Sequence, residues 1–148
     1  MKIFLGADHA GFKLKNKIKT YLEELGEEVF DKGANELNEQ DDYPDFILPV
    51  ARAVREDKGA KGIILGGSGQ GEAIVANKIP GVRAVVYYGG DKKILTLSRE
   101  HNDANVLSLC ARFLTEEEAI TAVKLWLETS FSKEERHERR IKKIEELS

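Results

Sequence analysis

Short apolar runs alternate with longer amphipathic stretches along most of the chain. Such runs are too short for helices and are mostly apolar at successive positions, which indicates strands buried on both faces of a parallel sheet. They lie at residues 3–5, 29–30, 63–65, 82–87 and 106–109. Parallel neighbours need a crossover connection, and the stretches between the runs have helical length. The sequence therefore predicts an α/β domain with a mainly parallel sheet of about five strands and helices on both faces.

Apolar spacing and capping residues mark the helices. One helical face carries apolar residues up to a stop at Gly26: Leu14, Ile18, Tyr21, Leu22 and Leu25. Thr115 with Glu118 predicts a capping box, and Ser132 with Glu135 predicts a second one before the C-terminal helix.

Two further segments carry weaker signals. Residues 33–42 are expected to form an irregular loop. Pro49 is expected to confine a helix starting near Pro44 to its first turn, or to kink it.

The length of 148 residues and a hydrophobic content of 41% suit one domain, residues 1–148. A formal net charge of -3 gives no overall field towards nucleic acid or an anionic membrane, so we expect neither partner.

The single cysteine, Cys110, excludes an intrachain disulfide and a CxxC zinc pair, and it is expected to pack in the core. With no apolar stretch of membrane-spanning length, the expected location is the cytoplasm.

A glycine-rich loop follows the third predicted strand. It runs Gly66-Gly67-Ser68-Gly69-Gln70-Gly71-Glu72 and precedes a helix-compatible stretch. Glycines permit positive φ and let successive N–H groups face one anion. Because ligands bind at the carboxyl ends of parallel strands, the loop predicts a phosphate or oxyanion site. A purely structural glycine turn is the alternative.

Three familiar loop motifs do not fit these residues. A Walker A loop needs Lys followed by Ser or Thr after the last glycine, where this chain has Glu72. A dinucleotide-binding loop needs G-x-G-x-x-G, but Gly67, Gly69 and Gly71 are spaced two and two. A nucleophile elbow fails because Gln70 takes its final glycine position. Triphosphate binding, dinucleotide binding and acyl transfer are therefore disfavoured.

Titratable side chains lie beside the predicted strand ends. Glu72 is either a base that removes a proton from carbon or an ordinary glutamate in the first turn of a helix. Asp8-His9 follows the first strand and His101-Asn102-Asp103 precedes the fifth, so each histidine either exchanges protons at a strand-end site or is a surface residue or a helix cap. We expect no metal, since the sequence has no HExxH motif and no Cys-His cluster. His137 is predicted to lie on a helix surface.

The C-terminal helix is highly charged, with a thin apolar stripe of Ile141, Ile144 and Leu147. The stripe fits a solvated terminal helix and a dimer interface equally well. Arg136 and Arg140 lie on one face, where they either bind a phosphate or pair with nearby glutamates. Arg112, just after the fifth strand, is a third candidate phosphate ligand.

Six blocks occur in a fixed order: Gly6 to Phe12, Asp42-Tyr43-Pro44, Gly66 to Glu72, Ala76-Asn77-Lys78, Ser98 to Asn105 and Arg136 to Arg140. Their order and spacing resemble those of the ribose-5-phosphate isomerase type B family, which includes galactose- and allose-phosphate isomerases. The likeness runs almost end to end. It implies a Rossmann-like αβα sandwich without a metal or organic cofactor. It also implies a homodimer or a dimer of dimers with shared active sites, the C-terminal helix extending to a partner subunit.

The resemblance also implies roles for residues. His101 would open the furanose ring and Asn102 would bind substrate hydroxyls. Sugar and phosphate would be held by Asp8, His9, Tyr43, Arg112, Arg136 and Arg140. The Ser68 hydroxyl and the N–H groups of Gly67, Gly69 and Gly71 would stabilise an enediolate. Many members carry a cysteine base where this chain has Gly66. The chain resembles another branch with a glutamate after the loop, which assigns proton transfer between C1 and C2 to Glu72.

The expected activity is therefore the interconversion of ribose 5-phosphate and ribulose 5-phosphate by ring opening and enediolate proton transfer. Two alternatives are an isomerase for a six-carbon aldose phosphate and a non-catalytic phosphosugar-binding module.

Overall fold

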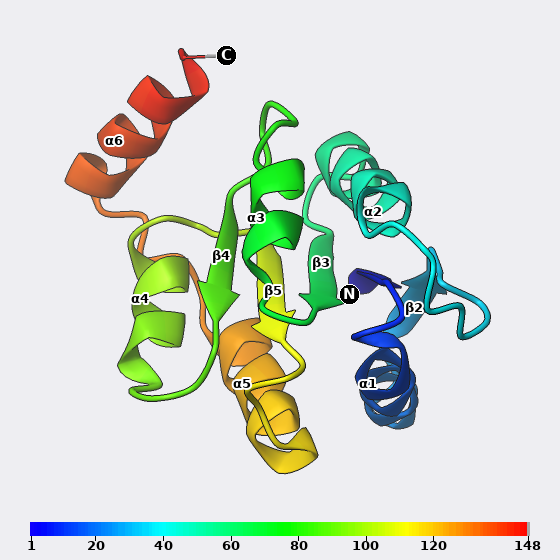
Figure 1. Cartoon of the computed structure of the whole chain (residues 1–148). Helices are drawn as coiled ribbons and strands as arrows, with labels where there is room; N and C mark the ends of the chain where they lie inside the picture. Colours follow the sequence, from blue (N-terminus) through cyan, green and yellow to red (C-terminus); the bar gives the residue numbers. More distant parts are fainter. Residues whose placement is uncertain (148) are drawn as a thin grey trace.

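The computed structural model describes residues 1–147, which form one five-stranded parallel sheet in the order β2-β1-β3-β5-β4 (Figure 1). The strands are β1 (Lys2–Ala7), β2 (Glu28–Asp31), β3 (Lys61–Gly66), β4 (Ala84–Tyr87) and β5 (Val106–Cys110). The helices are α1 (Phe12–Glu24), α2 (Pro44–Glu56), α3 (Gln70–Ala76), α4 (Lys93–Glu100), α5 (Glu116–Glu128) and α6 (Glu135–Glu145). Strands and helices alternate as far as α5, which confirms the predicted α/β fold.

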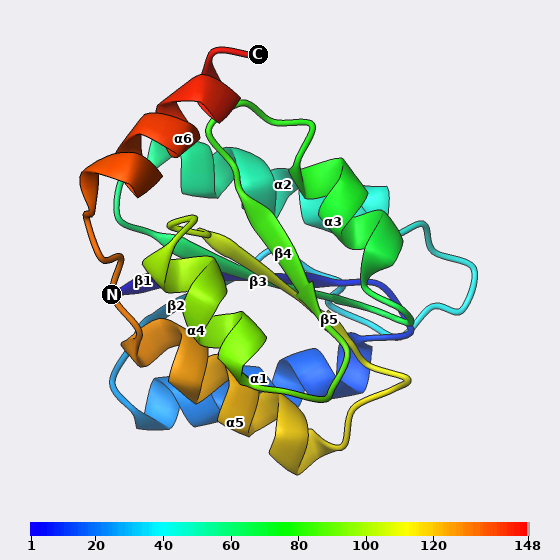
Figure 2. The same cartoon turned by 90° about the vertical axis from the view of Figure 1, so that its left-hand side faces the viewer.

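Helices cover both faces of the sheet. In Figure 2, α2 and α3 lie on one side and α1 and α5 on the other. Along β1, Ile3 and Leu5 pack with Trp126 of α5, while Phe4 between them packs with Val50 of α2. Successive residues of a strand point to opposite faces, so a strand covered on both sides must be apolar throughout. This packing explains the short, mostly apolar runs of the sequence.

Helix α2 differs from its prediction. It continues through Pro49 to Glu56, so the prediction that the proline would confine the helix to its first turn is wrong. Proline removes one backbone hydrogen bond. Burial of Ile47, Val50 and Val54 against the sheet offsets that loss. Residues 33–42 form the expected irregular loop.

The two predicted capping boxes had different outcomes. Thr115 and Glu118 form theirs, each side chain accepting from the other residue's backbone N–H at 3.1 Å. The box predicted at Ser132 is wrong. Helix α6 begins two residues later, with Glu134 as N-cap, and no side chain caps it. Ser132 Oγ instead accepts from Glu134 N at 3.4 Å within the connecting segment.

Helix α6 lies at one corner of the molecule, beyond the amino end of β4 (Figures 1 and 2). An ion pair of 2.7 Å between Arg83 Nη1 and Glu145 Oε1 joins it to the strand region. Ile144 remains 47% exposed, so α6 keeps part of its apolar stripe in solvent. Within residues 1–147, no helix combines the length and apolar character that crossing a membrane requires.

Candidate functional site

The glycine loop connects the carboxyl end of β3 to α3, as predicted. Gly69 has a φ of +74°, in the left-handed region, and is the N-cap of α3. Ser108 Oγ donates to Gly69 O at 2.7 Å, and the Cys110 thiol donates to Ser68 O. Ser108 and Cys110 of the neighbouring strand β5 therefore hold the backbone of the loop in place. Cys110 is buried as predicted, and burial together with the nearby Glu72 raises its pKa to about 11, so its thiol stays neutral.

Other predicted site residues surround the same loop. A Cβ built on Gly71 would lie 2.6 Å from Tyr43 Oη, and one on Gly67 would lie 3.1 Å from Arg112 Nη1. Glycine is thus needed where Tyr43 and Arg112 approach the loop. Asp8 and His9 follow β1 at the same edge of the sheet. We call this group the carboxyl-edge cluster; its members are Asp8, His9, Tyr43, Ser68, Glu72 and Arg112.

Glu72 is the buried acid of this cluster. Its side chain points into the protein from the first turn of α3, and the residue is only 4% exposed. Burial raises its pKa, and Asp8 raises it further, although a backbone hydrogen bond acts in the opposite direction. A carboxylate held in this way has a pKa closer to neutral, which suits a general base.

The Glu72 carboxylate occupies the space that a side chain at position 66 would fill. A Cβ built on Gly66 would overlap the Glu72 carboxyl carbon and both of its oxygens. The Glu72 carboxylate therefore lies directly over the α-carbon of residue 66. A cysteine side chain at position 66 would displace the Glu72 carboxylate from this place, which agrees with the glycine found there in place of the cysteine.

Asp41 is a site residue that the sequence analysis missed. Its Oδ1 accepts from His9 Nδ1 at 2.7 Å and from the His9 backbone N–H at 3.1 Å. Potential metal-ligand atoms of Asp8, His9 and Asp41 all lie within 4.8 Å of one another. The histidine nitrogen facing the two acids is already hydrogen-bonded to Asp41, so the arrangement is that of an ion pair. Asp41 lies in an irregular loop far from His9 in sequence, and no local motif points to it.

The remaining predicted residues lie at the opposite edge of the sheet. His101 is the C-cap of α4 and precedes β5, so it lies at the amino edge, which corrects the strand-end position considered from sequence. Its ring stacks on that of His137, with centroids 4.2 Å apart and an angle of 17°. The prediction that His137 lies on a helix surface is wrong, because contact with His101 leaves it only 4% exposed.

Arg136 and Arg140 lie beside this histidine pair on α6. Arg136 Nε donates to His137 Nε2 at 3.4 Å. Burial lowers the pKa of His137, and electrostatic repulsion by the neighbouring His101, Arg136 and Arg140 lowers it further, against an opposing effect of Glu134. The amino-edge cluster, as we call it, consists of His101, Asn102, Arg136, His137 and Arg140.

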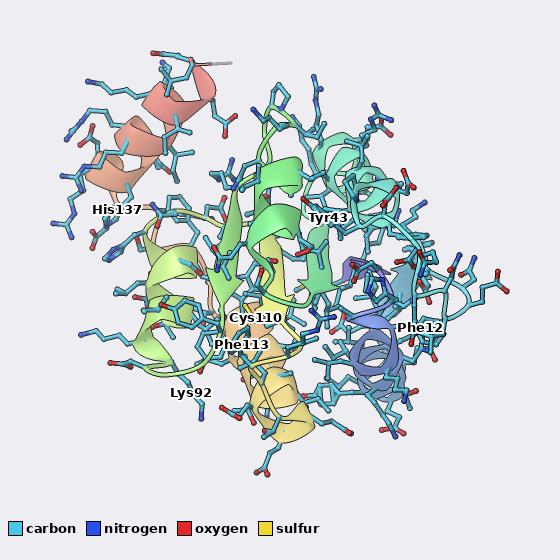
Figure 3. The ribbon with its side chains drawn as sticks, viewed as in Figure 1. Phe12, Tyr43, Lys92, Cys110, Phe113 and His137 are labelled. Atoms are coloured by element: carbon cyan, nitrogen blue, oxygen red, sulfur yellow. The ribbon has the colours of Figure 1, made fainter. Side chains whose placement is uncertain are left out.

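One chain does not bring the two clusters together. Glu72 follows the carboxyl end of β3, whereas His101 precedes the amino end of its neighbour β5. A strand of five residues spans roughly 15 Å, so the clusters are separated by about the height of the sheet. In Figure 3, His137 lies on α6, well away from Cys110 and Phe113 at the end of β5 and from Tyr43.

Comparison with known proteins agrees with these observations. The pattern of a family described as Ribose/Galactose Isomerase matches residues 3–144. A ribose-5-phosphate isomerase B of Mycobacterium tuberculosis is 43% identical over 141 residues, 95% of this chain and 86% of that protein. A putative sugar phosphate isomerase of Bacillus subtilis is 37% identical, covering 97% of this chain and 95% of the relative.

Solved structures show the same similarity. The crystal structure of ribose-5-phosphate isomerase B from Mycoplasma genitalium with bound ribulose-5-phosphate has a TM-score of 0.93 and 40% identity, covering 99% of this chain and 95% of that one. The Clostridium thermocellum enzyme has a TM-score of 0.92 and 44% identity, with 99% and 97% covered. The family pattern, the relatives and the shared fold lead to one conclusion: this chain belongs to the ribose/galactose isomerase family.

Proposed function

We propose that this chain interconverts ribose 5-phosphate and ribulose 5-phosphate through an enediolate, in active sites that each combine the two clusters from different subunits. The observation that carries the proposal is the buried Glu72 carboxylate held over Gly66 beside the glycine loop. It supplies a base in a place where donors for an oxyanion are also available. The family membership agrees with this chemistry, since the similar Mycoplasma genitalium enzyme binds ribulose-5-phosphate.

The proton transfers balance without a cofactor. Glu72 removes the proton from C2 of the open-chain aldose, and the carbonyl oxygen at C1 becomes the enediolate oxygen. That oxygen gains a proton, the oxygen at C2 loses one, and Glu72 returns its proton to C1. Loop N–H groups of Gly67, Gly69 and Gly71 and the Ser68 hydroxyl stabilise the developing charge. One such donor contributes about 3 kcal/mol, and a positioned base contributes about 10²- to 10⁴-fold in rate.

The remaining groups bind and open the sugar. His9 and Arg112 of one subunit, with Arg136 and Arg140 of a second, hold the phosphate, while Tyr43 and Asp8 contact the sugar. His101 of the second subunit opens the furanose ring and Asn102 binds hydroxyl groups. Phosphate binding remote from C1 and C2 supplies orientation for the reaction. A homodimer or a dimer of dimers in the cytoplasm fits these roles and the free, buried Cys110.

Proton NMR of ribose 5-phosphate with the protein in deuterated water tests the reaction. Formation of ribulose 5-phosphate with deuterium at C2 of recovered aldose is the expected result. Conversion of a six-carbon aldose phosphate alone would transfer the proposal to that substrate. Binding without conversion or exchange would refute catalysis.

Mixing two inactive variants tests the sharing of sites. In a dimer with shared sites, a Glu72→Gln chain and a His101→Gln chain together form one intact site and one doubly altered site. Unfolding and refolding the mixture should then restore about a quarter of the parent activity, since half of randomly paired dimers are mixed. No recovery, with dimers formed normally, would refute shared sites.

A further inference from the structure

Asp41 holds the His9 ring at two points. The same oxygen, Oδ1, accepts from Nδ1 of the ring at 2.7 Å and from the His9 backbone N–H at 3.1 Å. These bonds fix the ring relative to its own main chain and place a proton on Nδ1. No hydrogen bond within residues 1–147 uses Nε2, and the side chain is 27% exposed. Nε2 is therefore the ring nitrogen available to a ligand.

The Asp41 carboxylate has little contact with solvent. Its side chain is 8% exposed, and Oδ2 is buried without a hydrogen-bond partner among the described residues. A buried carboxylate with half of its acceptors unsatisfied is costly unless a positive charge lies beside it. His9 is the group positioned to provide that charge.

The loop that carries Asp41 is anchored independently of His9. The fully buried Lys15 donates from Nζ to Asp31 Oδ1 at 2.8 Å and to Ala34 O at 2.6 Å. Asp31 is the last residue of β2 and Ala34 follows it closely, so both acceptors lie at the start of the loop that leads to Asp41. Asp41 is thus held near His9 by the fold as well as by the hydrogen bonds between the two residues.

The charges around His9 favour its protonated form. The hydrogen bond to Asp41 is the largest influence and raises the His9 pKa; Asp8, whose Oδ2 lies 3.9 Å from Nδ1, and the charge of Asp41 also raise it. Burial and Arg112 act in the opposite direction, and the net change is upward. Since a raised histidine pKa extends the cationic form to higher pH, His9 keeps its charge where a free imidazole, with a pKa of about 6.5, loses it.

We propose that Asp41 is a positioning residue for phosphate recognition: it orients the His9 ring through two hydrogen bonds and places a carboxylate against Nδ1, so that Nε2–H donates a hydrogen bond to the substrate phosphate. The proposal rests on the proposed function, which places the phosphate at His9 and Arg112. A phosphate dianion beside Asp8 and Asp41 brings four negative charges into one region. Arg112 and the two proposed arginines of the second subunit, Arg136 and Arg140, supply three positive charges against these four, so a neutral His9 would leave the phosphate site with net negative charge and weaken binding.

The test compares Asp41→Asn, Asp41→Ala and the control Glu39→Gln, which removes a charge from an exposed position of the same loop. Asparagine keeps an acceptor for Nδ1–H but has no charge, whereas alanine loses both. The measurements are kcat and KM for ribose 5-phosphate between pH 6 and pH 8.5. The His9 imidazole is also titrated by NMR in ¹⁵N-histidine-labelled protein without ligand, and again with inorganic phosphate. Thermal unfolding confirms that each variant is folded.

In the asparagine variant we expect a lower midpoint for His9 and a KM about tenfold above the parent at pH 8, with kcat nearly unchanged. This corresponds to replacing a charge-assisted hydrogen bond by a neutral one. At pH 6 the ratio of KM values should approach one, because His9 is then protonated without help. For Asp41→Ala the KM ratio should stay above one at pH 6, because the ring has also lost its hydrogen-bond acceptor. Glu39→Gln should match the parent in KM and in the His9 midpoint at every pH.

An unchanged His9 midpoint in Asp41→Asn, or a KM ratio that does not vary with pH, would overturn the proposal. If the parent protein converts no sugar phosphate, the proposed function fails by itself. The ligand-free titration and the response of His9 to inorganic phosphate then decide the role of Asp41 separately. If inorganic phosphate does not shift the ¹⁵N signals of His9 in the parent protein, the proposed role of Asp41 in phosphate recognition is also overturned.

Discussion

Replacing Gly66 by alanine should inactivate the protein while leaving its fold intact. Gly66 ends β3 with a φ outside the left-handed region, so the backbone accepts a side chain there. The added methyl group would overlap the Glu72 carboxyl carbon and both oxygens. These atoms form the end of a flexible side chain, which can rotate away. The substitution therefore displaces the proposed base and leaves the strand in place.

The expected magnitudes follow from this geometry. A correctly placed base contributes about 10²- to 10⁴-fold, so kcat for ribose 5-phosphate should fall by about that factor. KM should change little, because the proposed phosphate ligands are untouched. Moving Glu72 from its buried position should cost no more than about 1–3 kcal/mol of unfolding free energy, the range for an overpacked site.

A double-mutant cycle identifies the cause. If alanine at position 66 acts through Glu72, adding Gly66→Ala to Glu72→Gln should produce little further loss of kcat. Rates are measured with purified, folded variants, using urea unfolding as the check on stability. Parent-like kcat in Gly66→Ala would refute the assignment of Glu72 as the base. Two losses that multiply in the double variant would show that residue 66 acts by another route.

Three other predictions concern pH, stability and phosphate binding. Burial and Asp8 raise the pKa of Glu72, and the base must be ionised to act, so kcat/KM should fall on the acid side of the pH profile with an apparent pKa above the value of about 4.3 of an ordinary glutamate. An apparent pKa at or below that value would contradict this. Lys15→Met leaves Asp31 without its buried partner and should lower the free energy of unfolding, measured in urea, by about 3–5 kcal/mol. The control Lys17→Met changes an exposed residue of the same helix and should lower it by less than about 0.5 kcal/mol; equal effects would contradict a stabilising buried pair. Arg136→Ala should raise KM for ribose 5-phosphate about tenfold with a smaller change in kcat, and the control is Arg139→Ala, whose side chain pairs with Glu135; unchanged KM would remove Arg136 from the phosphate site.

Much of the fold could be predicted because its signals are local. The unbroken run at Ile63 to Leu65 indicates a strand covered on both faces, and the Thr115 capping box marks the start of a helix. Predictions were wrong where tertiary contacts outweigh local preference. Packing against the sheet keeps α2 helical through Pro49, and a backbone hydrogen bond from Ser132 N–H to Glu100 O at 3.2 Å joins Ser132 to the end of α4 instead of to α6.

The site was less predictable, since its contacts join distant segments. The glycine loop and Glu72 form one local motif, and the structure places them together at a strand end. Asp41 meets His9 only because the anchored loop after β2 passes over the end of β1. His137 is polar in a charged helix, and only the fold shows that its ring stacks on His101.

The separation of Glu72 from His101 is a consequence of topology. In a parallel sheet each crossover helix returns the chain to the amino edge, so the end of α4 lies across the sheet from the loop after β3. Changing a side-chain conformation does not close a gap of roughly 15 Å. Under the roles proposed for His101 and Glu72, ring opening and proton transfer on one sugar require a second copy of the chain, whose amino edge meets the carboxyl edge of the first. Under twofold symmetry the same pairing forms two identical sites, so a variant that remains monomeric should lose turnover even with every proposed residue present.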